Sequence, residues 1–164
     1  MRFYTKEQAL HKVAALCSKA EKCVFDVEKK LTQWEIPQSE IDEIVDYLIK
    51  EKFLDEERFV RYYIKDKLTF NGWGKQKVRF QLQQKRVDMT LFQQLWEEID
   101  EDQYQEQLLY LLQKKRKSIK DTDPWAVKQK LMRYAAGRGF QMDEIYSALD
   151  ALAAGADDDS SGAL

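Results

Sequence analysis

The feature that most constrains the fold is a pattern of apolar residues that occurs three times along the chain. Seven apolar positions in the first third recur after a shift of 51 residues and again after a further 53, and all twenty-one positions are apolar. Each set has the same five-residue step across a turn, so helical periodicity alone does not explain the match. The pattern predicts a structural repeat. The first set is Val27, Leu31, Ile36, Ile41, Ile44, Val45 and Leu48; the second is Val78, Leu82, Val87, Phe92, Leu95, Trp96 and Ile99; the third is Leu131, Ala135, Phe140, Ile145, Ala148, Leu149 and Leu152.

One further amphipathic segment precedes each set, at residues 5–19, 55–68 and 102–112. We therefore expect three units of three helices, at residues 1–54, 55–100 and 101–154, and a disordered acidic tail at residues 155–164. A unit of about 50 residues buries too little apolar surface to be stable alone, so successive units should pack end on end. The predicted fold is all-α, with three tandem three-helix repeats forming an elongated, curved module.

Local helix signals agree with this fold. The 164 residues include only six Gly and two Pro, and no run alternates apolar and polar residues at the period of a strand. Residues 5–8 have the spacing of a capping box, and Pro124 follows Asp123 at a first helical position. Gly137 and Gly139 mark a helix end or a tight turn.

Several classes of protein are excluded or disfavoured. No apolar run approaches the roughly 20 residues that cross a bilayer, and the N-terminus lacks the apolar core of a signal peptide. We expect a cytoplasmic protein with no membrane partner. Cys17 and Cys23 lie six residues apart without the partner ligands of a zinc site, so both are interpreted as reduced packing residues.

Catalytic chemistry has little support in the sequence. His11 is the only histidine and no metal-binding motif surrounds it, so we interpret it as a surface residue. Residues 72–75, Gly-Trp-Gly-Lys, have the wrong spacing for a phosphate-binding loop and are expected to form a turn between helices. The sequence predicts no enzyme activity, no cofactor and no metal. A metal-dependent hydrolase with carboxylates on facing helices stays open as an alternative.

Two basic tracts are the best candidates for function. The chain has 27 basic and 29 acidic residues, but residues 58–86 contain nine basic residues and one acid, and residues 114–138 contain nine basic residues and two acids. If residues 73–87 form one helix, Lys75, Arg79 and Arg86 share a single face with Gln76 and Gln83. Such a strip suits phosphate or an acidic protein surface, although a solvated face remains the alternative.

Aromatic residues are interspersed with these bases, and we assign them to packing because aromatics at helical spacing are most often core residues. They are Phe59, Tyr62, Tyr63, Phe70, Trp73, Trp125 and Tyr134.

The second unit contains Asp55-x-x-Arg58-Phe59 and then Gly72-x-Gly74-Lys75, followed by the apolar positions of the pattern. This combination resembles the central motif of the RecX family of regulators of the RecA recombinase. Arg138-Gly139-Phe140 with Ile145 and Leu149 resembles the C-terminal repeat of that family. The chain departs from the pattern at Val60, where a small residue is usual, at Lys67, where we expect arginine, and at Arg86, where glycine often closes the helix.

The resemblance implies a non-enzymatic monomer that binds the RecA nucleoprotein filament, lies in its helical groove, and restrains strand exchange and ATP hydrolysis. It also implies weak, non-specific contact with single- or double-stranded DNA. An independent DNA-binding protein of helix-turn-helix type is the alternative. The candidate partner-binding or DNA-binding residues are Lys65, Lys67, Lys75, Lys77, Arg79, Lys85, Arg86, Lys114, Lys115, Arg116, Lys117, Lys120, Lys128 and Lys130.

Overall fold

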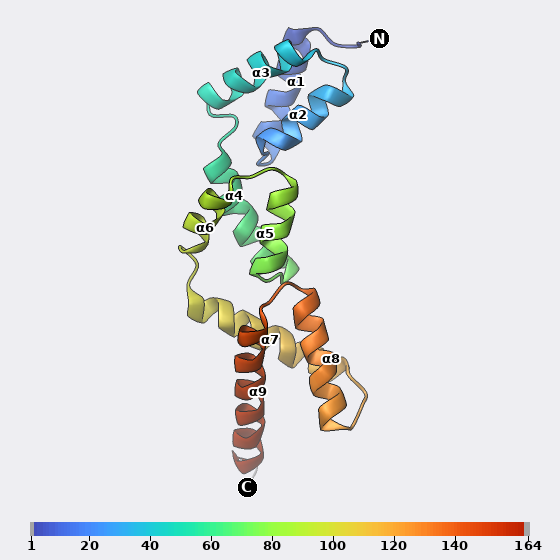
Figure 1. Cartoon of the computed structure of the whole chain (residues 1–164), viewed down its shortest axis with the longest axis vertical. Helices are drawn as coiled ribbons and strands as arrows, with labels where there is room; N and C mark the ends of the chain where they lie inside the picture. The colour runs from blue at the N-terminus through green and yellow to red at the C-terminus, as the bar shows by residue number, and fades with distance from the viewer. Residues whose placement is uncertain (1, 163–164) are drawn as a thin grey trace. The chain divides into compact units, whose positions relative to one another are not determined.

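The computed structural model describes the backbone of residues 2–162 and the side chains of residues 2–155. Within that part of the chain the structure is all helical, with nine α-helices, one π-helical turn and no strand, which confirms the predicted fold class (Figure 1). No helix in it combines the length and the apolar character needed to cross a membrane. The elements are α1 (Lys6–Lys19), α2 (Val24–Gln33), α3 (Gln38–Lys50), α4 (Glu56–Asp66), the π-helical turn η1 (Lys67–Asn71), α5 (Lys75–Gln84), α6 (Met89–Trp96), α7 (Glu101–Ser118), α8 (Pro124–Gly137) and α9 (Met142–Gly162).

Helices α1 and α8 begin where the sequence signals predict, and α7 has an aspartate cap that the sequence signals did not include. The Thr5 hydroxyl accepts the backbone N–H of Gln8, whose side chain accepts the N–H of Thr5, so α1 has a complete capping box. Asp100 caps α7 and Asp123 caps α8, each by accepting backbone N–H groups of the first turn.

The repeat is visible in the backbone at three equivalent turns, each of which follows the second helix of a predicted unit. Glu35, Arg86 and Gly139 all have positive φ, of 60°, 59° and 97°. After each of them, the next backbone N–H donates to the carbonyl five residues earlier, which closes the helix end. These bonds run from Ile36 to Leu31, from Val87 to Leu82 and from Phe140 to Ala135, at 3.1–3.2 Å.

This turn explains the five-residue step in the apolar pattern. The donor and the acceptor of each closing bond are both apolar residues of the pattern, and such a helix end brings their side chains into contact. Eighteen of the twenty-one pattern positions are buried, and Trp96, Ile99 and Leu152 are partly buried. The prediction that these residues form the core is therefore confirmed.

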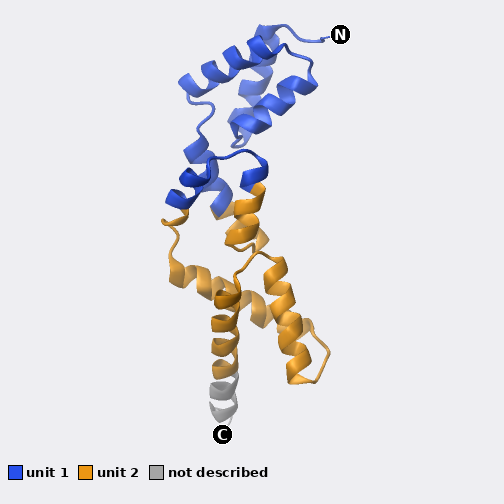
Figure 2. Cartoon of the chain, viewed as in Figure 1, with its two compact units in different colours: residues 1–64, 82–95 blue, residues 65–81, 96–164 orange. Residues whose placement is uncertain are grey.

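Contacts divide the chain into two compact units (Figure 2). The first unit comprises residues 1–64 and 82–95, and the second comprises residues 65–81 and 96–164. The three-repeat boundaries at residues 54, 100 and 154 stay a prediction. The proposed disordered tail lies outside the residues whose side chains are described, apart from Gly155.

In the first unit, α1, α2 and α3 enclose an apolar core that includes Val13, Leu31 and Ile44. Cys17 and Cys23 are buried and unpaired, and burial raises the pKa of Cys23 to about 12. Arg58, near the start of α4, forms an ion pair with Glu21, with 2.6 Å between the Arg58 Nε and the Glu21 Oε1.

In the second unit, α7, α8 and α9 pack around Leu108, Leu131 and Ile145. The start of α5 docks on the turn between α8 and α9, where the Gly74 N–H donates to the Arg138 carbonyl at 2.7 Å. The backbone N–H of Lys75 donates to the Tyr104 hydroxyl at 3.0 Å, and that of Gln76 donates to the Gly139 carbonyl at 2.9 Å. These partners satisfy the orphan donors at the start of α5, which has no acidic residue in its first turn.

Candidate functional site

Helix α5 carries part of the predicted basic strip. Lys75 and Arg79 are four residues apart on this helix and therefore lie on one face. The assumption of one helix over residues 73–87 is wrong: α5 ends at Gln84, and Arg86 adopts the left-handed conformation of the closing turn. Arg86 lies outside the strip, with its guanidinium 5.5 Å from the centroid of the Phe25 ring.

Two lysines of the first basic tract are held against one indole ring in the second unit. The Lys67 ammonium lies 5.1 Å and the Lys77 ammonium 4.8 Å from the centroid of Trp73. An ammonium over an aromatic face is attracted by the negative face of the ring. The ring therefore restricts two long side chains that would otherwise be mobile.

A second ring holds two cations in the same way. Lys115 and Arg138 each lie 5.2 Å from the centroid of Tyr134. The Arg138 guanidinium also donates to the carbonyl of Asn71 at 2.7 Å, two residues before Trp73. The structure thus joins the two predicted basic tracts within the second unit. Arg138 was missing from the predicted site, although it closes the second basic tract in the sequence.

Most candidate cations have no carboxylate partner. Among the described residues, ion pairs bind Lys67 to Asp66, Lys85 to Asp26 and Lys130 to Asp121, and none is formed by the other eleven candidates. Lys115, Arg116 and Lys117 fall in the last turn of α7, where cations complement the helix dipole. The exposed candidates are Lys65, Arg79, Arg86, Lys114, Arg116, Lys117, Lys120, Lys128 and Lys130.

Lys85 forms an ion pair with Asp26 inside the first unit. Its ammonium donates to Asp26 at 2.7 Å, and both side chains are less than a third exposed. Burial alone would raise the pKa of Asp26, but hydrogen bonds from Lys85 and Cys23 outweigh burial and lower the pKa. Folding therefore gains stability from the ionised Asp26 at pH values above the ordinary pKa of about 3.9, and loses it as the pH falls through the lowered value.

Replacing Lys85 with methionine is expected to lower the free energy of unfolding by about 1–2 kcal/mol at neutral pH, because Asp26 would stay partly buried without its cation. The difference from the unmutated chain should shrink below about pH 4, where Asp26 becomes protonated. Urea unfolding at neutral and acidic pH measures both effects. An equal loss of stability at both pH values would contradict this account of the pair.

The aromatic residues differ from the prediction that all of them are packing residues. Phe59 is buried and Tyr63, Trp73 and Tyr134 are partly buried. The prediction is wrong for Tyr62, Phe70 and Trp125, which are 53%, 81% and 69% exposed. Helical spacing predicts which residues share a face, but not whether another element covers that face.

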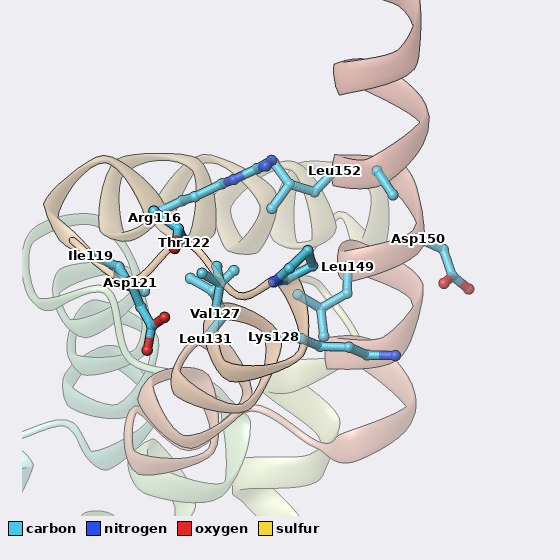
Figure 3. A pocket seen from close by; sticks show the side chains of 12 residues that line it. Arg116, Ile119, Asp121, Thr122, Val127, Lys128, Leu131, Leu149, Asp150 and Leu152 are labelled. Atoms are coloured by element: carbon cyan, nitrogen blue, oxygen red, sulfur yellow. The ribbon is translucent and has the colours of Figure 1, made fainter.

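The second unit also contains a pocket of about 490 Å³ (Figure 3). It lies between the end of α7, the loop after it, α8 and α9. Its apolar lining includes Ile119, Val127 and Leu149, and the candidate cations Arg116 and Lys128 belong to the same lining. Sequence reasoning missed this pocket because no local motif marks it. Within the described residues, no group of three or more His, Cys, Asp or Glu side chains could hold a metal ion.

Two family models match the chain. The model described as RecX, second three-helix domain, matches residues 55–94. The model described as RecX, third three-helix domain, matches residues 101–149. The two matches together cover more than half of the 164 residues.

Curated relatives with the name Regulatory protein RecX are similar to most of the chain. The relative from Clostridium botulinum (strain Eklund 17B / Type B) is 32% identical over 129 residues, which are 77% of this chain and 58% of the relative. The relative from Clostridium tetani is 28% identical over 82% of this chain and 61% of its own length. The relative from Serratia proteamaculans is 36% identical over 65% of this chain and 62% of its own length. The chain thus spans about three fifths of the length of these relatives.

Two solved structures share the fold. The crystal structure of RecX from Lactobacillus salivarius has a TM-score of 0.80 at 17% identity, with 90% of this chain and 96% of that chain covered. A second crystal structure of regulatory protein RecX has a TM-score of 0.81 at 16% identity, with 88% and 73% covered. At these identities the likeness shows the fold alone.

Proposed function

This chain belongs to the RecX family, and we propose that it regulates the RecA recombinase by binding the RecA nucleoprotein filament in its helical groove. In this proposal the chain inhibits or modulates strand exchange and ATP hydrolysis by RecA. It therefore acts in homologous recombination, DNA repair and the SOS response, and its location is the cytoplasm. The relatives' name, Regulatory protein RecX, supports a regulatory role.

The observation that carries the proposal is the set of cations without carboxylate partners. Eleven of the fourteen candidate residues form no ion pair among the described residues. A chain whose formal net charge is −2 has acids enough to pair them, yet among the described residues most bases of the two tracts form no ion pair. Cations in this state can contact phosphates or an acidic protein surface without first breaking an internal ion pair.

The two aromatic rings favour a preorganised contact surface. Trp73 holds Lys67 and Lys77, and Tyr134 holds Lys115 and Arg138, at 4.8–5.2 Å. A long side chain that is already restricted loses less conformational entropy when it binds. These four cations are therefore suited to a fixed array of negative charge, such as the phosphates and acidic side chains along a filament.

Regulation by binding alone needs no catalytic group. A chain that contacts successive protomers and the DNA they hold would restrain the movements that accompany ATP hydrolysis and strand exchange. We expect DNA alone to be bound weakly and without sequence preference, because backbone phosphates carry no sequence information.

The alternative is an independent DNA-binding protein, which the three-helix units also permit. Titrations of the chain against RecA filaments and against two unrelated naked duplexes, each at several salt concentrations, separate the two. We expect the chain to bind the filament more tightly than either duplex at physiological salt. We expect it to bind both duplexes with the same affinity, which falls as the salt concentration rises. A clear preference for one naked duplex over both the other duplex and the filament would favour the alternative.

A further inference from the structure

The pocket in the second unit has an apolar floor that no neighbouring side chain fills. Val127 and Leu131 from α8 face Leu149 and Leu152 from α9, and Ile119 closes the side next to α7. Leu131 and Leu149 belong to the core of this unit, so the floor is continuous with it. A volume of about 490 Å³ lies in the range of pockets that bind a ligand or a partner's side chains.

Four charged side chains, two cations and two acids, line the pocket around this floor. Arg116 and Lys128 line it, and neither forms an ion pair among the described residues. Figure 3 shows the Arg116 guanidinium reaching toward Leu152, and the Asp150 carboxylate and the Lys128 ammonium extending to the same side of the view.

The remaining acid of the lining, Asp121, already has two hydrogen-bond donors. The Asp121 carboxylate accepts a hydrogen bond from the Lys130 ammonium, with an N to O distance of 3.5 Å. It accepts a second from the backbone N–H of Asp123, at 3.1 Å. The hydrogen bond from Asp123, with that from Lys130, lowers the pKa of Asp121. Lys117 and Lys120, which adjoin lining residues in the sequence, are exposed and form no ion pair among the described residues.

We propose that this pocket receives an aliphatic side chain from an acidic segment of a partner protein. The aliphatic floor fits a leucine-like anchor, and the cations of the lining fit carboxylates on either side of that anchor. A protein fits better than a nucleic acid, because none of the lining side chains is aromatic and the floor therefore offers no stacking platform for a base. The inference rests on the proposed function in one respect, since the partner tested is the RecA protomer of the filament.

Replacing Leu152 with aspartate tests the pocket, because a carboxylate in the floor removes the apolar contact and repels an acidic segment. We expect the affinity for a filament of RecA on single-stranded DNA to fall about tenfold to a hundredfold. Leu109→Asp is the matched control, because Leu109 is also a partly buried leucine of this unit but lines a different pocket, beside Asp102 and Glu106. Equal losses for both variants, with both chains folded by circular dichroism, would overturn the proposal.

A photo-crosslinking amino acid at Thr122, an exposed residue of the pocket lining, identifies what lies on the pocket without disturbing its floor. The unmutated chain is first tested for filament binding. If it binds, a crosslink to a RecA peptide that has carboxylates beside an aliphatic residue supports the proposal. A crosslink to the DNA, or no crosslink at saturation, overturns the proposal and leaves the proposed function standing. If the chain does not bind filaments, the proposed function has failed and this inference fails with it.

Discussion

Replacing Gly139 with alanine is expected to lower the free energy of unfolding by about 2–4 kcal/mol. Gly139 has a φ of 97°, beyond the range near 60° that Glu35 and Arg86 adopt at the equivalent turns. A Cβ atom there would also lie 2.5 Å from the backbone nitrogen of Lys77. Backbone atoms cannot move aside as a flexible side chain does, so the start of α5 would have to separate from the turn after α8.

Gly74→Ala should give a similar loss, of about 1–3 kcal/mol, from the opposite side of the same contact. Its Cβ would lie 2.6 Å from the carbonyl carbon of Gly139 and from the nitrogen of Phe140. Gly137→Ala is the matched control, because Gly137 lies in α8 and its added Cβ would have no atom within 4 Å apart from its chain neighbours and the backbone of its own helix. Alanine there should raise stability by up to about 1 kcal/mol, since alanine favours helix.

Urea unfolding followed by far-ultraviolet circular dichroism measures all three variants. The expected order is loss for Gly139→Ala and Gly74→Ala, and no loss for Gly137→Ala. Wild-type stability in the first two variants would contradict the close approach of these two backbone segments.

The second large effect concerns cations that form no ion pair among the residues whose side chains are described. Reversing Arg79, Lys114 and Lys117 to glutamate is expected to raise the concentration of chain needed to inhibit ATP hydrolysis by RecA filaments about a hundredfold. Each exposed contact contributes up to about 1 kcal/mol, and about 1.4 kcal/mol corresponds to a factor of ten. All three side chains are exposed and form no ion pair among the described residues, so the fold should be preserved.

Reversal of Lys19, Lys29 and Lys50 is the control for this variant. These lysines are exposed residues of the first unit, and their reversal changes the net charge by the same amount. If the two triple variants lose inhibition equally, overall charge and not the basic tracts controls binding. If neither loses inhibition, the tracts are solvated faces.

The fold was predictable from the sequence because its repeat is encoded in apolar side chains. The step from Leu31 to Ile36 and its two equivalents reports a helix end whose closing hydrogen bond and apolar contact involve the same residues. The early end of α5 is indicated by the same step, from Leu82 to Val87, and by Arg86, which stands where glycine often closes the helix. The assumption of one helix over residues 73–87 did not use these two signals, because arginine itself does not indicate a left-handed turn.

The candidate site was predictable only in its composition. Charge counting finds the two basic tracts, but it does not distinguish Lys85, which is bound to Asp26, from Lys77, which lies over an indole ring. Pairing between distant residues decides such roles, and one sequence contains no direct signal of it. The link from Arg138 to Asn71 spans 67 residues and needed the folded chain.

The central claim is that the chain regulates RecA by binding its filament, and ATP hydrolysis by RecA on single-stranded DNA tests it most directly. RecA is held at a fixed concentration while the chain is added from far below to equal molar amounts. We predict that hydrolysis falls while the chain is still substoichiometric, because one bound chain affects more than one protomer. Unchanged hydrolysis up to equimolar chain, with the chain folded, would contradict the account.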